Sequence, residues 1–399
     1  MSVEVDVKGS VDKGFEAVKE VFENNFVQYG EIGAAVCVYH KGKKVVDLWG
    51  GYKEPEGNYM WERQTVVPIF STTKAVAVSC LALCHARGYF SFDDPVAQYW
   101  PEFAQKGKEK VSIAMLLAHR AGLSAIDTPL TPQLIRDTQQ LDTILAAQKP
   151  AWQPGDYQGY HVWNIGWYIS ALIERIDPKK RRLKAFFNEE ILPHLDGDIR
   201  IGIESDYPFD NIAILKPFSK LKGLFAMPFS FVFEFFKPWS LSFRSMLNPS
   251  FAGSHANFNK HEILELEMGA GGGIASASAL ASMMAKMYSD SSCAIYVGRE
   301  TLEAITRYPD MPTRGFTDIV FKQEAFRFHL GFMRPSKEHN FSDYESAFGG
   351  FGAGGSFVQY EPDSDTVIAY VMNNMTEAMM NGEREVAIRD AVHKVLRKI

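Results

Sequence analysis

One stretch, residues 68–76, decides how the rest of this chain is interpreted: Pro-Ile-Phe-Ser-Thr-Thr-Lys-Ala-Val. Apolar positions continue at helical spacing beyond it as far as Gly88, which predicts a helix whose first turn contains Ser71. Ser71 and Lys74 are three positions apart, so the spacing places the amine beside the hydroxyl on one helix face. Backbone N–H groups of the helix N-terminus point toward the same place.

The Ser71 and Lys74 pair has two interpretations. A serine becomes an effective nucleophile when a neighbouring base removes its proton, and Lys74 offers such a base. The same four residues are equally compatible with a serine that caps the helix and a lysine that faces solvent. Motifs elsewhere in the chain have to show which of these two interpretations is correct.

Composition narrows the class of protein. The 399 residues are 46% hydrophobic and 23% charged, which is typical of a soluble globular chain with one large domain or two closely packed ones. The net charge of −6 and the lack of a basic arm argue against nucleic acid as a partner. The four cysteines are too few for a disulfide framework, and Cys80 and Cys84 fit an apolar helix face as free thiols. With no secretory signal or apolar span evident, we expect a cytoplasmic location.

Secondary-structure patterns flank the central stretch on both sides. Residues 11–28 have the spacing of an amphipathic helix, and residues 33–40 and 44–51 form a predicted antiparallel hairpin. Ser112 is a candidate cap for a short helix that ends at Gly122, and His119 near that end is expected to have a structural hydrogen-bonding role. Near the C-terminus we expect an edge strand within 347–358, a strand at 367–372 and a final amphipathic helix.

The order of several motifs resembles a known superfamily. After the Ser71 helix come Asp-Asp-Pro-Val at 93–96, Pro-Glu-Phe at 101–103 and Met-Leu-Leu-Ala-His-x-x-Gly-Leu at 115–123. This combination resembles the serine β-lactamase-like superfamily, which contains class C β-lactamases, DD-peptidases, family VIII carboxylesterases and eukaryotic β-lactamase-like proteins. The resemblance extends over roughly 15–260 and again over 265–399.

The resemblance implies an α/β fold of the α+β type. Residues 1–110 and 325–399 are expected to form a domain with an antiparallel sheet flanked by helices. Residues 111–324 are expected to form an inserted, mostly helical domain, which includes an aromatic-rich segment at 216–247. The site would lie in the cleft between the two domains.

A second motif follows the Pro-Gly turn at 154–155. In the family, a Tyr-x-Asn element places a tyrosine against the serine to share its proton, and Tyr160 matches that tyrosine. Val162 stands where the asparagine would bind a substrate amide, which argues against efficient β-lactam or peptide recognition. Tyr157 is a competing candidate, and a buried Tyr160 with a structural hydroxyl is a third interpretation. His161 is a candidate substrate contact.

The third motif departs most from the family pattern. Relatives place Lys-Thr-Gly or His-Gly-Gly on a strand beside the serine, and alignment on the glycines gives Gly350-Phe351-Gly352 here. The basic residue that usually holds a substrate carboxylate is missing, which disfavours β-lactams and D-alanyl peptides. Glycines still leave room for a substrate carbonyl near the backbone. The resemblance implies an oxyanion hole made by the backbone N–H groups of Ser71 and Ala353.

Two further segments carry open interpretations. The basic cluster at 178–182 is expected to be a solvated face. Residues 218–243 contain eight phenylalanines and Trp239, flanked by cations. They are interpreted as core, as a lid over an apolar pocket, or as a segment that contacts lipid. The glycine-rich run at 269–273 lacks the Gly-Lys-Ser/Thr of a phosphate loop.

The motifs together predict a serine hydrolase that forms an acyl-enzyme on a small or apolar ester. Ser71 would be the nucleophile, and Lys74 and Tyr160 would share the role of base. No metal or organic cofactor is expected, and the partner is a small-molecule ester or amide. The alternatives are a weak or inactive binding or assembly protein and a β-lactamase or D-amino-acid peptidase. The oligomeric state is left open.

Overall fold

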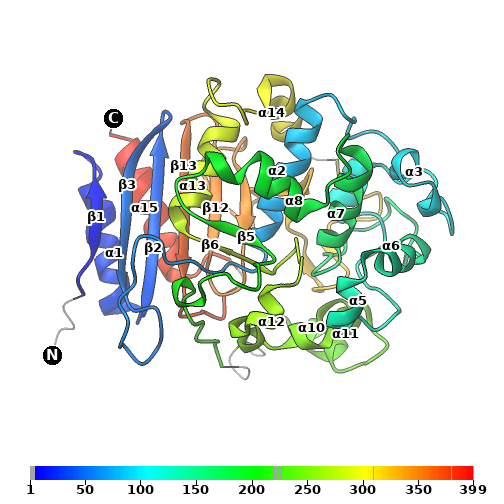
Figure 1. The fold of residues 1–399 in the computed structure, drawn as a ribbon, viewed down its shortest axis with the longest axis horizontal. Coiled ribbons are helices and arrows are strands. Elements are labelled where there is room, and N and C mark those ends of the chain that lie inside the picture. The colour runs from blue at the N-terminus through cyan, green and yellow to red at the C-terminus, as the bar shows by residue number, and fades with distance from the viewer. Residues whose placement is uncertain (1–4, 220–222, 224–226, 309, 379, 399) are drawn as a thin grey trace.

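The structure is a computed structural model that describes residues 5–219, 223, 227–308, 310–378 and 380–398. An antiparallel sheet forms one side of the molecule and a larger group of helices forms the other, with both termini on the sheet side (Figure 1). The sheet has eight strands in the order β1-β3-β2-β13-β12-β11-β10-β9. They are β1 (Lys8–Val11), β2 (Gly33–His40), β3 (Lys43–Gly51), β9 (Arg327–His329), β10 (Phe332–Arg334), β11 (Phe348–Phe351), β12 (Phe357–Glu361) and β13 (Thr366–Met372).

The two ends of the chain meet in the centre of this sheet. β2 pairs with β13 from His40 opposite Thr366 to Ala34 opposite Met372. Nearly every residue of both strands is buried, which explains their almost continuous apolar sequence. The expected antiparallel sheet built from an N-terminal hairpin and C-terminal strands is therefore confirmed.

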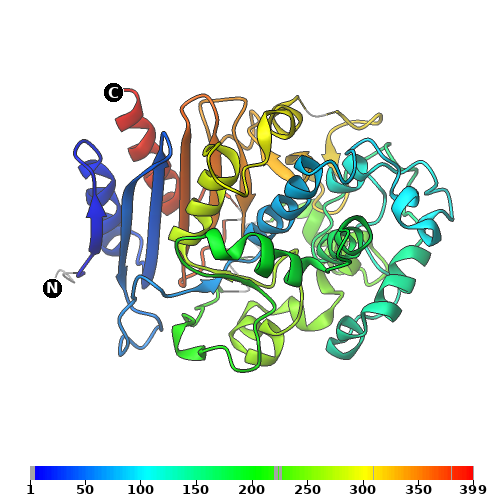
Figure 2. The same ribbon diagram turned by 45° about the horizontal axis from the view of Figure 1, so that its top comes forward.

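Helices cover both faces of the sheet. α1 (Glu16–Gln28) and α15 (Glu383–Leu396) lie together on one face, and α13 (Ala277–Tyr288) crosses the other (Figures 1 and 2). α2 (Thr72–Ala86) runs between the sheet and the helical side, and its side chains from Thr72 to Cys84 are all buried. Cys80 and Cys84 are free buried thiols, as expected.

The remaining elements occupy mainly the helical side. Its α-helices are α3 (Val96–Tyr99), α4 (Ile113–Leu117), α5 (Pro132–Arg136), α6 (Thr138–Ala147), α7 (Ile165–Ile176), α8 (Leu183–Glu190), α10 (Phe229–Phe235), α11 (Leu241–Leu247), α12 (His261–Leu264) and α14 (Gly298–Thr306). A three-stranded sheet of β4 (Val67–Pro68), β6 (Gly273–Ala275) and β5 (Ile199–Ile201) leads into α2 and α13, and β7 (Thr317–Asp318) pairs with β8 (Gln323–Glu324). The division into two domains at the expected boundaries stays a prediction.

Three predicted elements differ from the observed ones. Residues 8–11 belong to β1, which pairs with β3, so the first helix begins at Glu16 instead of Val11. Ser112 does cap α4 by accepting a hydrogen bond from the Met115 amide at 3.1 Å, but the helix ends at Leu117 because His119 adopts a positive φ of 59°. β11 is not an edge strand, since β10 and β9 lie beyond it.

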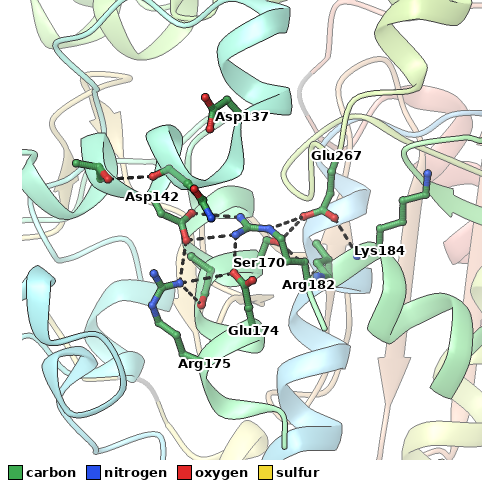
Figure 3. Close-up of polar contacts among 12 residues, drawn as sticks. Asp137, Asp142, Ser170, Glu174, Arg175, Arg182, Lys184 and Glu267 are labelled. Carbon is green, nitrogen blue, oxygen red and sulfur yellow. Dashed lines mark hydrogen bonds and ion pairs between the residues drawn. The ribbon is translucent and has the colours of Figure 1, made fainter. Parts of the chain in front are cut away.

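The basic cluster at 178–182 is a solvated face only in part: Pro178, Lys179 and Lys180 are exposed, whereas the side chains of Arg181 and Arg182 are mostly buried in ion pairs. Arg182 forms ion pairs with Asp142 at 3.2 Å and with Glu174 at 2.7 Å, within a network that also contains Arg175 (Figure 3). Arg181 likewise pairs with the buried carboxylate of Asp177 at 2.8 Å. The two arginines therefore fasten α7, α6 and α8 together, and their sequence pattern alone does not reveal the acidic partners.

The aromatic-rich segment at 216–247 is helical in part, and residues 220–222 and 224–226 lie outside the described residues. α10 buries Phe231 and exposes Phe229 and Phe233 to solvent. None of the helices in the described ranges is both long and apolar enough to cross a membrane.

Candidate active site

The turn before α2 has an unusual backbone. Phe70 adopts a positive φ of 43°, which is costly for an aromatic residue with a Cβ atom. Its ring is buried and packs edge-on against the rings of His255 and Phe258, each at a centroid distance of 5.0 Å. This packing holds the backbone in a conformation that presents Ser71 at the start of α2.

Ser71 and Lys74 lie in contact, as their spacing predicted. The Lys74 Nζ atom is 3.1 Å from the Ser71 Oγ atom. It also donates hydrogen bonds to the carbonyl oxygens of Val162 at 2.8 Å and Ala270 at 2.7 Å. The lysine side chain is buried, so a solvent-facing Lys74 is excluded.

Burial without a counter-ion changes the ionisation of Lys74. In the described part of the chain, no carboxylate forms an ion pair with this amine. Desolvation therefore holds the pKa of Lys74 well below its usual value of 10.5. A neutral amine has two N–H donors, which the Val162 and Ala270 carbonyls satisfy, and one lone pair, which is then left for the Ser71 hydroxyl. This geometry suits a base.

Tyr160 is the second side chain at the Ser71 hydroxyl. The Ser71 hydroxyl is near enough to the Tyr160 phenol to lower its pKa, and the Lys74 amine lies 4.7 Å from the centroid of the Tyr160 ring. Burial raises the pKa of the Tyr160 phenol above its usual value of 10, although the Ser71 hydroxyl opposes that rise. Tyr160 is therefore a neutral phenol beside a lysine whose neutral form is favoured.

Asp318 holds the backbone of Tyr160 from behind. Its Oδ2 atom accepts the Tyr160 amide hydrogen at 2.9 Å, and its Oδ1 atom accepts the amides of Val320 at 2.8 Å and Phe321 at 3.0 Å. The carboxyl group is completely buried, and desolvation raises its pKa to about 6. The Phe321 ring returns to contact the Tyr160 ring at 5.7 Å.

Two histidines lie behind Tyr160. His119 accepts the His161 amide hydrogen on Nδ1 at 3.2 Å, and its ring packs edge-on against Tyr160 at 4.9 Å. His161 is fully buried, and its Nδ1 atom bonds the Gly159 carbonyl at 2.8 Å. Burial lowers the pKa of His161 to about 4 and that of His119 well below 6.5, so both rings are neutral. The structural role expected of His119 is confirmed, whereas substrate contact by His161 stays a prediction.

β11 approaches the nucleophile from the sheet side. β11 pairs with β10 at Gly349 opposite Met333, and its following residues lie beside α2. A Cβ atom on Gly350 would come within 2.7 Å of the Ala75 Cβ atom, and one on Gly352 would come within 2.2 Å of the Ile69 carbonyl oxygen. Glycine is therefore required at both positions for the strand to lie this close to the helix.

The turn after β11 is tied to the residues around the nucleophile. Ser356 donates its hydroxyl to the Ile69 carbonyl at 2.8 Å, and Thr72 donates to the Ser356 carbonyl at 3.0 Å. Within the described residues, the amides of Ser71 and Ala353 have no hydrogen-bond acceptor. Two free N–H groups at these positions have the chemistry of an oxyanion hole.

Two sequence candidates point elsewhere. The Phe351 ring packs between Phe341 at 4.7 Å and Phe357 at 5.7 Å, on the opposite side of β11 from Gly350. Phe351 therefore presents its backbone, and not its ring, to the Ser71 side, and its expected role in substrate binding stays a prediction. Tyr157 bonds the exposed Arg314 instead of the serine. Among the described residues, no three His, Cys, Asp or Glu side chains gather as metal ligands.

Several contributors to the site had no signal in the sequence. Asp318 lies in no motif, and only the folded chain brings it to Tyr160. The carbonyls of Val162 and Ala270 act through the backbone, so their residue types give no information. The positive φ of Phe70 is equally invisible, because an aromatic residue is an unfavourable choice there.

Comparison with known proteins agrees with this geometry. A family model described as "Beta-lactamase" matches residues 18–393, and the chain therefore belongs to the beta-lactamase family. The esterase/beta-lactamase LipL of Mycobacterium tuberculosis is 28% identical over 380 residues, which cover 94% of this chain and 84% of that protein. The fold and the relatives' descriptions are those of hydrolases of the serine β-lactamase and esterase type.

Solved structures resemble the chain over nearly its whole length. A penicillin-binding protein homologue from Caulobacter crescentus is 30% identical with a TM-score of 0.81, and it is matched over 98% of this chain and 100% of that one. EstA from Arthrobacter nitroguajacolicus is 26% identical with a TM-score of 0.83, with 98% of each chain covered. A family VIII carboxylesterase, 23% identical, has the same fold with a TM-score of 0.84, over 98% of this chain and 100% of that one.

Proposed function

We propose that the protein is a serine carboxylesterase that hydrolyses small or apolar neutral esters through an acyl-enzyme on Ser71. The observation that carries the proposal is the buried Lys74 amine, 3.1 Å from the Ser71 hydroxyl, with no carboxylate partner and a lowered pKa. Lys108 is also buried and donates to two backbone carbonyls, so the contact with the Ser71 hydroxyl is the feature that distinguishes Lys74. Relatives described as an esterase/beta-lactamase and as EstA support the same reaction class.

In the proposed first step, the Ser71 Oγ atom forms a bond to the ester carbonyl carbon. The hydroxyl proton moves to the Lys74 Nζ atom, and the carbonyl π electrons move onto oxygen. The free amides of Ser71 and Ala353 donate to that oxyanion. Collapse breaks the bond to the alcohol oxygen, which takes the proton from Lys74 while the Tyr160 hydroxyl donates a hydrogen bond to it.

Water completes the cycle. It attacks the acyl carbon, gives a proton to Lys74, and the acid leaves as Ser71 Oγ regains that proton. One ester and one water thus become one acid and one alcohol, with the enzyme unchanged. Burial lowers the pKa of Lys74 and raises that of Tyr160. Lys74 therefore accepts the proton, whereas Tyr160 stays protonated and donates a hydrogen bond.

The preference for an uncharged ester follows from position 350. Gly350 has no side chain that could bind a carboxylate, and the contact with Ala75 leaves no space for one. The Tyr160 ring is also packed between the rings of Phe321 at 5.7 Å and Phe328 at 5.4 Å, so apolar surface borders the nucleophile. Both features favour apolar esters over β-lactams and D-alanyl peptides.

The test is covalent labelling with a fluorophosphonate probe, followed by peptide mass spectrometry. We expect one adduct on Ser71, its loss in Ser71→Ala, and its retention in the control Ser91→Ala, which changes an exposed serine. Turnover of p-nitrophenyl esters should fall by at least about 10³-fold in Ser71→Ala. Rapid hydrolysis of a chromogenic cephalosporin with no ester turnover would replace the esterase with a β-lactamase. No adduct on folded protein would indicate a binding or assembly protein.

A further inference from the structure

α10 exposes aromatic rings on one face, next to the candidate site. Phe229, Phe233 and Phe236 follow one another at i, i+4 and i+7, which places them on the same side of the helix. Their exposed fractions are 85%, 60% and 68%, and Trp239 just beyond the helix is 76% exposed. The opposite side of α10 buries Phe231, so the helix is packed against the protein through one aromatic face while a second one faces outward.

The buried side of α10 lies close to the residues proposed for catalysis. Phe231 contacts Phe321 at a centroid distance of 5.6 Å, and Phe321 contacts Tyr160 at 5.7 Å. Ser230 donates its hydroxyl to the Lys322 carbonyl at 3.2 Å, which also fixes α10 to the segment that follows Asp318. A single ring, Phe321, therefore separates the buried side of α10 from Tyr160.

The charge of this region is opposite to that of the whole chain. Residues 211–260 contain six Lys or Arg and one acid, Glu234, in a chain with a net charge of −6. The Lys237 amine lies over the Phe233 ring, 4.0 Å from its centroid, and pairs with Glu234 at 2.7 Å. Exposed aromatic rings within a segment rich in cations suit an apolar phase beneath an anionic surface.

We propose that the outward face of α10, with Trp239, binds an anionic lipid–water interface. On the proposed esterase function, this contact would bring Ser71 to esters held in a lipid phase, so lipid-borne esters would be the substrate class. A second copy of the chain is the competing occupant, but the sequence of residues 211–260 has six cations and one acid, so two copies of this segment are not complementary in charge.

The binding test uses the Ser71→Ala protein, so that its result does not depend on catalysis. It is sedimented with phosphatidylcholine vesicles and with vesicles that also contain phosphatidylglycerol. We expect binding to the anionic vesicles, weaker binding at high salt, and about a tenfold or greater loss on adding Phe229→Ser, Phe233→Ser and Phe236→Ser. Val27→Ser with Tyr59→Ser is the matched control, because these exposed side chains lie on other elements.

Tryptophan fluorescence gives an independent readout. All seven tryptophans are described residues, and Trp239 is the one exposed to solvent. Anionic vesicles should shift the emission to shorter wavelength and protect it from acrylamide, and Trp239→Phe should abolish both changes. Equal binding of the triple variant and the control, or no binding to anionic vesicles, would overturn the proposal. So would a dimer in the absence of lipid that the triple variant converts to a monomer.

Activity separates this proposal from the esterase assignment. Wild-type protein is assayed on a water-soluble ester and on the same acyl group in an emulsified ester, with the triple variant in parallel. We expect the variant to lose activity on the emulsion and to retain it on the soluble ester. Vesicle binding without any ester turnover would support the lipid contact and contradict the esterase function. Turnover of the soluble ester without vesicle binding would support the esterase function and contradict the lipid contact.

Discussion

The Asp318 carboxylate accepts the amide hydrogen of Tyr160 at 2.9 Å, so a completely buried acid fixes the backbone of the tyrosine proposed to donate a hydrogen bond to the leaving oxygen. In Asp318→Asn the side chain keeps one acceptor oxygen, and its NH₂ group then faces a backbone N–H. We expect kcat to fall about tenfold or more as Tyr160 moves, with KM changed less. Steady-state kinetics on a soluble ester measures this, with Asp310→Asn, an exposed acid, as the control. Unchanged kcat would remove Asp318 from the positioning of Tyr160.

The same carboxyl group predicts a pH dependence of stability. Its pKa is raised to about 6 from 3.8, so the folded state binds this proton more tightly than the unfolded state. The resulting stabilisation is complete below the unfolded pKa and is lost as pH rises through about 6. The free energy of unfolding of the wild type, relative to Asp318→Asn, should therefore fall by about 2–3 kcal/mol between pH 4 and pH 7.5. Denaturant titrations at both pH values test this, and a constant difference would contradict it.

Lys74 must lose its proton before it can accept one from Ser71. Because burial lowers its pKa, kcat/KM should rise with pH and level off well below the usual lysine value of 10.5. Lys74→Arg keeps a cation that does not deprotonate, so activity should drop by about 10²–10⁴-fold with no recovery at alkaline pH. A pH–rate profile of both proteins is the measurement. An active arginine variant would show that the cation, and not the amine base, is what the reaction needs.

Tyr160→Phe removes one hydroxyl and keeps the ring that packs against Phe321 and Phe328. We expect a loss of kcat of about 10²-fold with little change in stability, because the ring contacts remain. Tyr157→Phe is the matched control, since that hydroxyl bonds Arg314, and it should keep its activity. Equal effects of the two substitutions on kcat would show that the catalytic role has been assigned to the wrong tyrosine.

The close approach of Gly350 to Ala75 predicts a coupled pair of substitutions. Gly350→Ala places a methyl group 2.7 Å from the Ala75 Cβ atom, which should destabilise the fold by about 1–3 kcal/mol and lower kcat. Ala75→Gly alone should cost about 1 kcal/mol as a helix glycine. The double variant should be more stable than the sum predicts, because the contact is relieved. Thermal unfolding of all four proteins completes the cycle, and simple additivity would contradict the contact.

The outline of the fold could be predicted because local patterns determine it. The alternating and buried apolar runs at 33–40 and 44–51 and the Lys-Gly-Lys turn between them specify a hairpin, and α2 follows from its periodicity. β1 was missed because Val11 also fits the helical spacing of Val18 and Phe22, and only its partner β3 shows that it is a strand. Arg181 and Arg182 appeared solvated because their acidic partners, such as Asp142, are distant in sequence.

The sequence predicted the side chains of the candidate site, but not the residues that hold those side chains in position. The spacing of Ser71 and Lys74 within one helix turn required only helix geometry, and the structure confirms that the two side chains are in contact. Asp318 and Ser356 act on residues more than a hundred positions away through backbone groups, which leave no trace in residue type. The aromatic-rich segment was ambiguous because one helix buries Phe231 and exposes Phe233, and period alone cannot distinguish the two faces.

The pairing of β2 with β13 has a consequence for synthesis on the ribosome. His40 pairs with Thr366, which is synthesised 326 residues later. At about 5–20 residues per second, the β2–β3 hairpin therefore leaves the ribosome roughly 15–65 s before β13. During that interval the apolar edge of β2 is unpaired, and it is open to pairing with other nascent chains. Slower translation of the 3′ part of the mRNA should therefore favour aggregation. A chaperone that covers β2 during this interval should raise the yield of folded protein.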